Sequence, residues 1–100
     1  MSTALVNTPI VENETLTNAN QEYSFVIPAG TMYAEVKART SAAWRIAFVT
    51  GKVATPTNPY ESVAAGGTLK MPPGIAMSAA VTVFVASGTA GLVLERERWN

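Results

Sequence analysis

The residues of this sequence that could perform acid–base chemistry are its glutamates, because the chain contains no histidine, cysteine or aspartate. Glu95 and Glu97 form the candidate pair. Two positions apart on a strand they would share one face, with Cα atoms about 6.5–7 Å apart, close to the carboxylate separation of inverting glycosidases. Any Glu-x-Glu in a strand has this spacing, however. Arg96 and Arg98 alternate with the two glutamates, and this pattern favours cross-strand ion pairs or a blunted sheet edge over catalysis.

The missing residue types exclude several kinds of site. Without histidine neither a Ser-His-Asp nor a Cys-His relay can form, and without cysteine there is no disulfide and no thiolate zinc site. Glu12 and Glu14, even with Asn13 or Asn18, supply too few oxygen ligands for calcium. The sequence therefore predicts a protein that is not an enzyme and has no catalytic residue, cofactor or metal site.

Charge and hydropathy exclude two classes of partner. Seven Lys and Arg balance seven Glu, whereas nucleic-acid modules carry a basic excess, so no direct contact with nucleic acid is expected. The longest apolar stretch, Ala79 to Ala86, is interrupted by Thr82 and is less than half as long as a membrane-spanning helix. No membrane association is expected either.

Four aromatic residues could stack on a ligand or contact a partner: Tyr33, Trp44, Tyr60 and Trp99. Trp44 shares the phase of the apolar residues that follow it, which favours the core. Tyr33 falls on the charged face of its strand and Tyr60 follows two loop prolines, so both are expected to be exposed, where a tyrosine suits a sugar or a protein contact equally. Trp99 either tucks into the core or anchors on a neighbouring subunit.

The N-terminal residues 1–20 differ from the rest of the chain, because eight of them are Thr or Asn. We expect them to form an extended arm in which Leu5-Val6 or Ile10-Val11 could add to a sheet edge; a frayed terminus is the alternative. Together with the exposed aromatic residues, the arm gives the candidate interface residues Leu5, Val6, Ile10, Val11, Tyr33, Tyr60 and Trp99.

Residues 21–100 follow a period of two, which indicates strands. Apolar residues alternate from Tyr23 to Ile27, from Met32 to Ala38 and from Trp44 to Phe48, and a hairpin is expected over Ser87 to Gly91 before a last strand, Leu92 to Trp99. Six to eight short strands, with consecutive strands expected side by side, predict an all-β, single-domain antiparallel β-sandwich (jelly-roll-like) that follows the N-terminal arm.

The composition favours a structural or interaction role. Charged residues make up only 14% of the chain and hydrophobic residues 48%, against about a quarter charged in typical domains. A surface poor in charge suits burial against other subunits, where charges are costly to desolvate. A homo-oligomer is therefore expected.

A further pattern lies in the segments Asn20-Gln21-Glu22-Tyr23-Ser24-Phe25, Ile27-Pro28-Ala29-Gly30-Thr31, Arg39-Thr40-Ser41, Arg45, Thr50-Gly51-Lys52-Val53-Ala54, Pro59-Tyr60 and Gly91-Leu92-Val93-Leu94-Glu95. With them the chain, from about Thr17 to Trp99, resembles small virion structural proteins of tailed bacteriophages. The resemblance implies a capsid decoration or cementing subunit, or another minor head or tail component. Such a protein is made in the host cytoplasm and located in the phage particle, and its partners are the major capsid protein or other virion subunits.

The resemblance transfers no catalytic residue. The alternative is a receptor- or carbohydrate-binding module of a phage tail or head fibre, with Tyr33 and Tyr60 as stacking platforms.

Overall fold

The computed structural model describes residues 9–70 and 78–99, which form eight β-strands. The strands are β1 (Pro9–Leu16), β2 (Tyr23–Ile27), β3 (Tyr33–Ala38), β4 (Trp44–Ala47), β5 (Glu61–Val63), β6 (Thr68–Lys70), β7 (Val81–Ala86) and β8 (Leu92–Trp99). Within these two ranges we find no helix with the length and apolar character that a membrane crossing requires.

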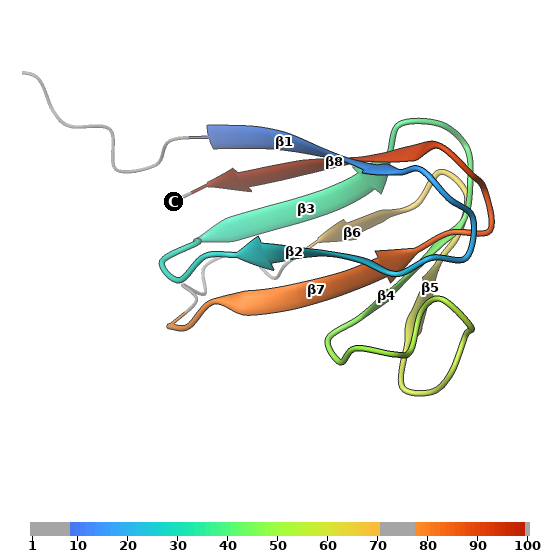
Figure 1. Ribbon diagram of the computed structural model, residues 1–100. Helices are drawn as coiled ribbons and strands as arrows, with labels where there is room; N and C mark the ends of the chain where they lie inside the picture. Colours follow the sequence, from blue (N-terminus) through green and yellow to red (C-terminus); the bar gives the residue numbers. More distant parts are fainter. Residues whose placement is uncertain (1–8, 71–77, 100) are drawn as a thin grey trace, which may run out of the picture.

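The strands form two four-stranded antiparallel sheets, sheet A with the order β1-β8-β3-β6 and sheet B with the order β2-β7-β4-β5. The sheets face each other, as Figure 1 shows. The predicted antiparallel sandwich is therefore confirmed. The predicted pairing of consecutive strands is wrong except for β4 and β5, because the chain otherwise passes from one sheet to the other. For the same reason Ser87 to Gly91 is no hairpin turn but connects sheet B to sheet A.

The core lies between the sheets, where the alternating apolar side chains of both sheets meet. Its buried members are Leu16, Phe25, Val36, Trp44, Ile46, Val63, Val83, Val85, Leu92 and Leu94. Trp44 is only 1% exposed, which confirms the core position expected for it. Phe48, expected to continue the same face, is instead 62% exposed, because β4 ends at Ala47 and the chain then leaves the sheet.

Within the N-terminal segment, Pro9–Leu16 forms β1, an edge strand of sheet A that pairs with β8 along its whole length. Ile10-Val11, which was expected to be able to add to a sheet edge, lies in this strand. Leu5 and Val6 lie outside the described residues. The Thr- and Asn-rich composition hides a period of two in which Leu16 is fully buried. The two glutamates that share its face are matched by arginines of β8, as described below.

A second, smaller apolar cluster lies on the outer side of sheet B. Ala47 and Ala86 meet Val53, which comes from the loop between β4 and β5 and is fully buried. Arg45 holds this loop, since its Nε donates a hydrogen bond to the Val53 carbonyl oxygen at 2.7 Å. Glu22 holds the loop from the other side by accepting hydrogen bonds from the Thr50 hydroxyl and the Gly51 amide. The loop is therefore a fixed part of the sandwich surface.

Candidate interaction surfaces

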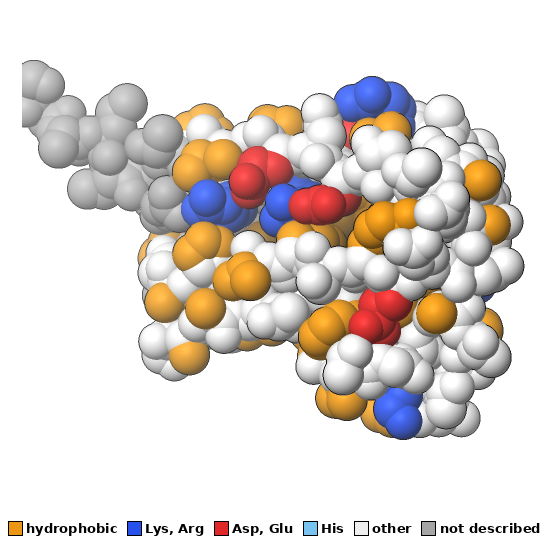
Figure 2. All heavy atoms as spheres, in the orientation of Figure 1, with side chains coloured by type: hydrophobic (Ala, Val, Ile, Leu, Met, Phe, Trp, Pro, Cys, Tyr) orange, Lys and Arg blue, Asp and Glu red, His pale blue; other side chains and the backbone are white. Residues whose placement is uncertain are grey.

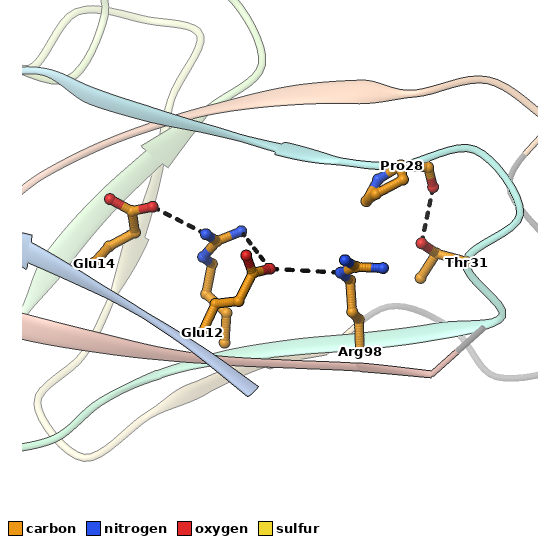
Figure 3. Close-up of polar contacts among 6 residues, drawn as sticks. Glu12, Glu14, Pro28, Thr31 and Arg98 are labelled. Atoms are coloured by element: carbon orange, nitrogen blue, oxygen red, sulfur yellow. Dashed lines mark hydrogen bonds and ion pairs between the residues drawn. The ribbon is translucent and has the colours of Figure 1, made fainter. Parts of the chain in front are cut away.

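Four charged side chains form a ladder between the two sheets. Arg96 contacts Glu14 (Nη2–Oε1 2.9 Å) and Glu12 (Nη1–Oε1 3.7 Å), and Arg98 contacts Glu12 (Nε–Oε1 3.5 Å). Figure 3 shows Glu12 between the two guanidinium groups. The guanidinium of Arg96 also lies over the Phe25 ring of sheet B, 4.1 Å from its centroid, in a cation–π contact. The cross-strand ion pairs expected for the C-terminal strand are therefore confirmed.

The two arginines of the ladder are largely shielded from solvent, its glutamates are more open (Glu12 44% and Glu14 27% exposed), and the ladder carries no net charge. The side chain of Arg96 is 12% exposed and that of Arg98 is 19% exposed. Acidic and basic side chains alternate along the gap between β1 and β2 in Figure 2. Because both arginines belong to β8 and both glutamates to β1, the ladder attaches the first strand to the last, and we assign it a structural role.

The outer face of sheet A brings together two of the predicted interface residues. Tyr33 of β3 and Trp99 of β8 are cross-strand partners, and the next pair on the same face is Glu35 and Glu97. The Tyr33 hydroxyl donates a hydrogen bond to Glu35 (3.2 Å), and the Trp99 indole Nε1 donates one to Glu97 (2.8 Å). Two aromatic rings therefore lie beside two carboxylates. Tyr33 and Trp99 are each half-buried, so Tyr33 is less exposed than expected.

The electrostatics of this face are negative near Tyr33. Partial desolvation, the charge and hydrogen bond of Glu35, and the charge of Glu97 together raise the pKa of the Tyr33 phenol. Each of these effects disfavours the phenolate: desolvation penalises its charge, the hydrogen bond stabilises the protonated phenol, and the two carboxylates repel a further negative charge. A neutral sugar or a cationic group fits this face better than an anion does.

The two glutamates considered for acid–base chemistry have different partners on this face. Glu95 forms an ion pair with Arg39 at 3.0 Å, and Glu97 accepts the hydrogen bond from Trp99. Both line a hollow of about 170 Å³ that also includes Val11 and Lys37. In the described ranges no three acidic residues are grouped so that they could hold a metal ion. The arrangement suits contact with a partner better than proton transfer.

A second candidate surface lies beside the loop between β4 and β5. Phe48 is 62% exposed and Val49 is 52% exposed. Together with Pro59, Tyr60 and Glu61 they border a shallow pocket of about 270 Å³. We call Phe48, Val49 and Tyr60 the β4-end patch. Tyr60 is half-buried rather than exposed, because it packs against the small cluster outside sheet B.

The sequence prediction named Tyr60 as a candidate interface residue and missed the other two residues of the patch. Phe48 continues the alternation of Trp44 and Ile46, so its phase alone predicted a core position. The available signal was the Thr50-Gly51-Lys52 break directly after Val49, since a strand that ends early releases its last side chains from the core.

An apolar cavity of about 310 Å³ lies between the sheets on the side of β5 and β6. Aliphatic side chains make up most of its lining, among them Ile27, Val36, Ile46, Leu69 and Val83. Glu61 and Lys70 come from the two edge strands beside it. Among the described residues, the interior thus holds ion pairs on the β1 side and a cavity on the β6 side.

The predicted interface residues do not form a single surface. Val11, which is 67% exposed, lies on the outer face of sheet A opposite Glu97, near the Tyr33–Trp99 pair. Ile10 is half-buried on the opposite face of β1. Tyr60 packs outside sheet B, so Tyr33 and Tyr60 cannot act as one stacking platform.

Comparison with known proteins defines the class of fold. Neither a protein-family model nor a curated protein matches the chain. Among solved structures, it is similar to the solution NMR structure of a de novo designed double-stranded β-helix. The TM-score is 0.50 at 15% sequence identity, and the alignment covers 94% of this chain and 97% of the designed one. The protein is thus an all-β sandwich that resembles a double-stranded β-helix, a jelly-roll-like fold.

Proposed function

We propose that this protein is a non-enzymatic structural subunit of a tailed-bacteriophage particle, a capsid decoration or cementing protein that acts through protein–protein contacts. Its partners are the major capsid protein or other virion subunits, and further copies of itself. It is made in the host cytoplasm and resides in the virion. The observation that carries the proposal is the β4-end patch.

The β4-end patch has the features of a protein contact. Phe48 and Val49 are adjacent large apolar side chains, each more than half exposed, and Tyr60 lies beside them. Aromatic residues in the centre of a contact often contribute most of its binding energy. Contiguous apolar side chains at the surface of a small domain commonly mark an interaction site.

Two further observations support a structural role. The outer-face carboxylates Glu95 and Glu97 each have a partner within the chain, which leaves them poorly placed as a catalytic pair. Eight-stranded sandwiches of the jelly-roll type occur in viral capsid and lectin domains. That second argument is an analogy at the level of the fold, because one fold hosts many functions.

The proposal is tested by co-sedimentation of the purified chain with empty capsids assembled from the major capsid protein of the same phage. We expect saturable binding that is lost in Phe48→Ser/Val49→Ser. Met32→Ser is the control, since Met32 is an exposed apolar residue that belongs neither to the β4-end patch nor to the candidate interface residues. Absence of binding by the native chain would refute the capsid role, and loss of binding in the control alone would refute the β4-end patch.

A carbohydrate-binding module is the second candidate, and the Tyr33–Trp99 pair favours it. Aromatic rings can stack on a sugar, and Glu35 and Glu97 offer acceptors for its hydroxyl groups beside them. On a glycan array this function predicts saturable binding that Tyr33→Ala abolishes and Tyr60→Ala, on the other sheet, leaves unchanged. An array without signal removes this candidate.

A further inference from the structure

The four edge strands of the sandwich differ in how well they are protected against pairing with another strand. An unpaired edge is a template for strand addition, and short length, proline, or a charge on the edge or pointing inward prevents it. β5 and β6 have three residues each, and they carry Glu61 and Lys70 respectively. β1 begins with Pro9 and directs Glu12 and Glu14 toward the other sheet. Each of these three edges therefore has at least one protective feature.

β2 is the exception. It consists of Tyr23-Ser24-Phe25-Val26-Ile27, five uncharged residues of which four are aromatic or β-branched apolar residues typical of strands. All five pair with β7 on one side, and no strand of the described chain pairs with the other side. On its outer face Ser24 is exposed and Val26 is 50% exposed. Nothing in this strand discourages the addition of a further strand.

We propose that β2 pairs with β2 of a second copy of this chain, so that the two B sheets join into one antiparallel sheet. A second copy fits because the strand is uncharged and its pattern is self-complementary. A charged strand from another protein would gain no ion pair along this edge. The inference deepens the proposed function by naming the contact between copies, and it rests on the edge geometry alone.

The pattern also defines the register. Antiparallel pairing about Phe25 places Phe25 opposite its own copy and Ser24 opposite Val26, and it uses all five residues. Every inner-face residue then meets an inner-face residue, as continuous burial requires. Pairing centred on Ser24 or Val26 would extend beyond the strand, to Glu22 on one side or to Pro28 on the other, and proline has no N–H to donate to a ladder.

The surroundings of β2 are compatible with a second copy. On its inner side β2 contacts the ladder, where Arg96 lies over Phe25 and is paired with Glu12 and Glu14. With two arginines and two glutamates the ladder is neutral, so two copies brought together along β2 do not repel each other through it. The contact is small, and we expect a reversible dimer rather than an obligate one.

Engineered cysteines test the register, because the native chain has none. Residues directly opposite on antiparallel strands have Cα atoms about 4.5–5.5 Å apart, within disulfide range. We expect mild oxidation of an equimolar mixture of Ser24→Cys and Val26→Cys chains to give a disulfide-linked heterodimer, and either chain alone to remain unlinked. No cross-link in the mixture, or efficient cross-linking of one variant alone, would overturn the proposed pairing.

A charge swap on the exposed outer face tests the contact itself by light scattering over a range of concentrations. Ser24→Lys/Val26→Lys places lysine opposite lysine in both outer pairs and should keep the protein monomeric. Ser24→Lys/Val26→Glu places opposite charges together and should retain the concentration-dependent doubling of mass. Equal behaviour of the two variants, each folded by circular dichroism, would overturn the proposal. Because no capsid is present, this outcome is independent of the capsid-binding test.

Discussion

The two faces of β8 carry two charged residues each, but the surroundings of these residues differ between the faces. The strand reads Glu95-Arg96-Glu97-Arg98, and its alternation sends both arginines to the space between the sheets and both glutamates to the outer face. Inside, the arginines share the two glutamates of β1. Outside, Glu97 lies opposite another carboxylate, Glu35, while Glu95 forms an ion pair with Arg39 and lies opposite Lys37. The arginines of the inner face are largely buried and pair with β1, whereas the outer glutamates lie on a more open face beside Lys37 and Arg39.

This difference shows where the few charges of the chain have structural consequences. Four of its fourteen charged residues form the ladder, which leaves the outer surface still poorer in charge. Buried ion pairs are weak evidence for added stability, but they can select one arrangement of the chain. A shift of β1 by one residue would turn Glu12 and Glu14 outward and leave both arginines without them. We infer that the ladder fixes the register of the first strand.

The largest effect is expected for Arg96→Ala. This change removes both of the Glu12 and Glu14 contacts and the cation–π contact with Phe25, and it leaves Glu12 with its ion pair to Arg98 alone. We expect the free energy of unfolding to fall by about 2–4 kcal/mol, below the upper end for fully buried pairs because the glutamates are partly exposed. Urea denaturation measures it.

Lysine in place of Arg96 is the matched variant. Arg96→Lys keeps the charge but not the fork that reaches both glutamates, so it should recover only part of the loss. If Arg96→Ala were as stable as the native protein, the ladder would have no role in holding β1.

A much smaller effect is expected on the outer face for Arg39→Ala. The ion pair of Arg39 with Glu95 is well exposed, since the exposed fraction of the side chain is 49% for Arg39 and 31% for Glu95. Surface ion pairs of this kind contribute about 0–1 kcal/mol to stability. The loss should also disappear in 1 M salt, where the Debye length is about 3 Å, whereas most of the Arg96→Ala loss should persist. Equal salt sensitivity of the two variants would contradict the contrast between the faces.

The sequence predicts the strands of this fold better than it predicts their neighbours. The last strand was expected over Leu92 to Trp99, and β8 has these bounds, because alternation is a local property that any half-buried strand shows. The partners of a strand depend on how the chain crosses between sheets, which no local pattern records. The same limit applies to β1: its polar composition indicated an arm that could add to a sheet edge, and only the arginines of a distant strand make its glutamates acceptable inside the sandwich.

The candidate surfaces show a related limit. Tyr33 was singled out by its place on the charged face of its strand and Trp99 as an aromatic residue that could anchor on a neighbour, but their adjacency depends on the β3–β8 register, which becomes visible only in the folded chain. Phe48 was missed because periodicity does not say where a strand stops.

The smallest effect is expected for the titration of Tyr33, and it tests the pair of carboxylates, Glu35 and Glu97, that lies beside this residue on the outer face. The pKa of this phenol is raised by partial desolvation and by the negative charges of Glu35 and Glu97, with Glu35 also accepting its hydrogen bond. In a Tyr23→Phe/Tyr60→Phe background, Tyr33 is the remaining tyrosine, and its phenolate absorbance reports its pKa directly.

Glu35→Gln should lower this pKa toward the ordinary value, since it removes a nearby negative charge. Glu95→Gln, which does not contribute to the shift, should leave it unchanged. If Glu35→Gln left the pKa of Tyr33 unchanged too, the charges of the outer carboxylates would be fully screened by solvent. The ladder alone would then distinguish the two faces of β8.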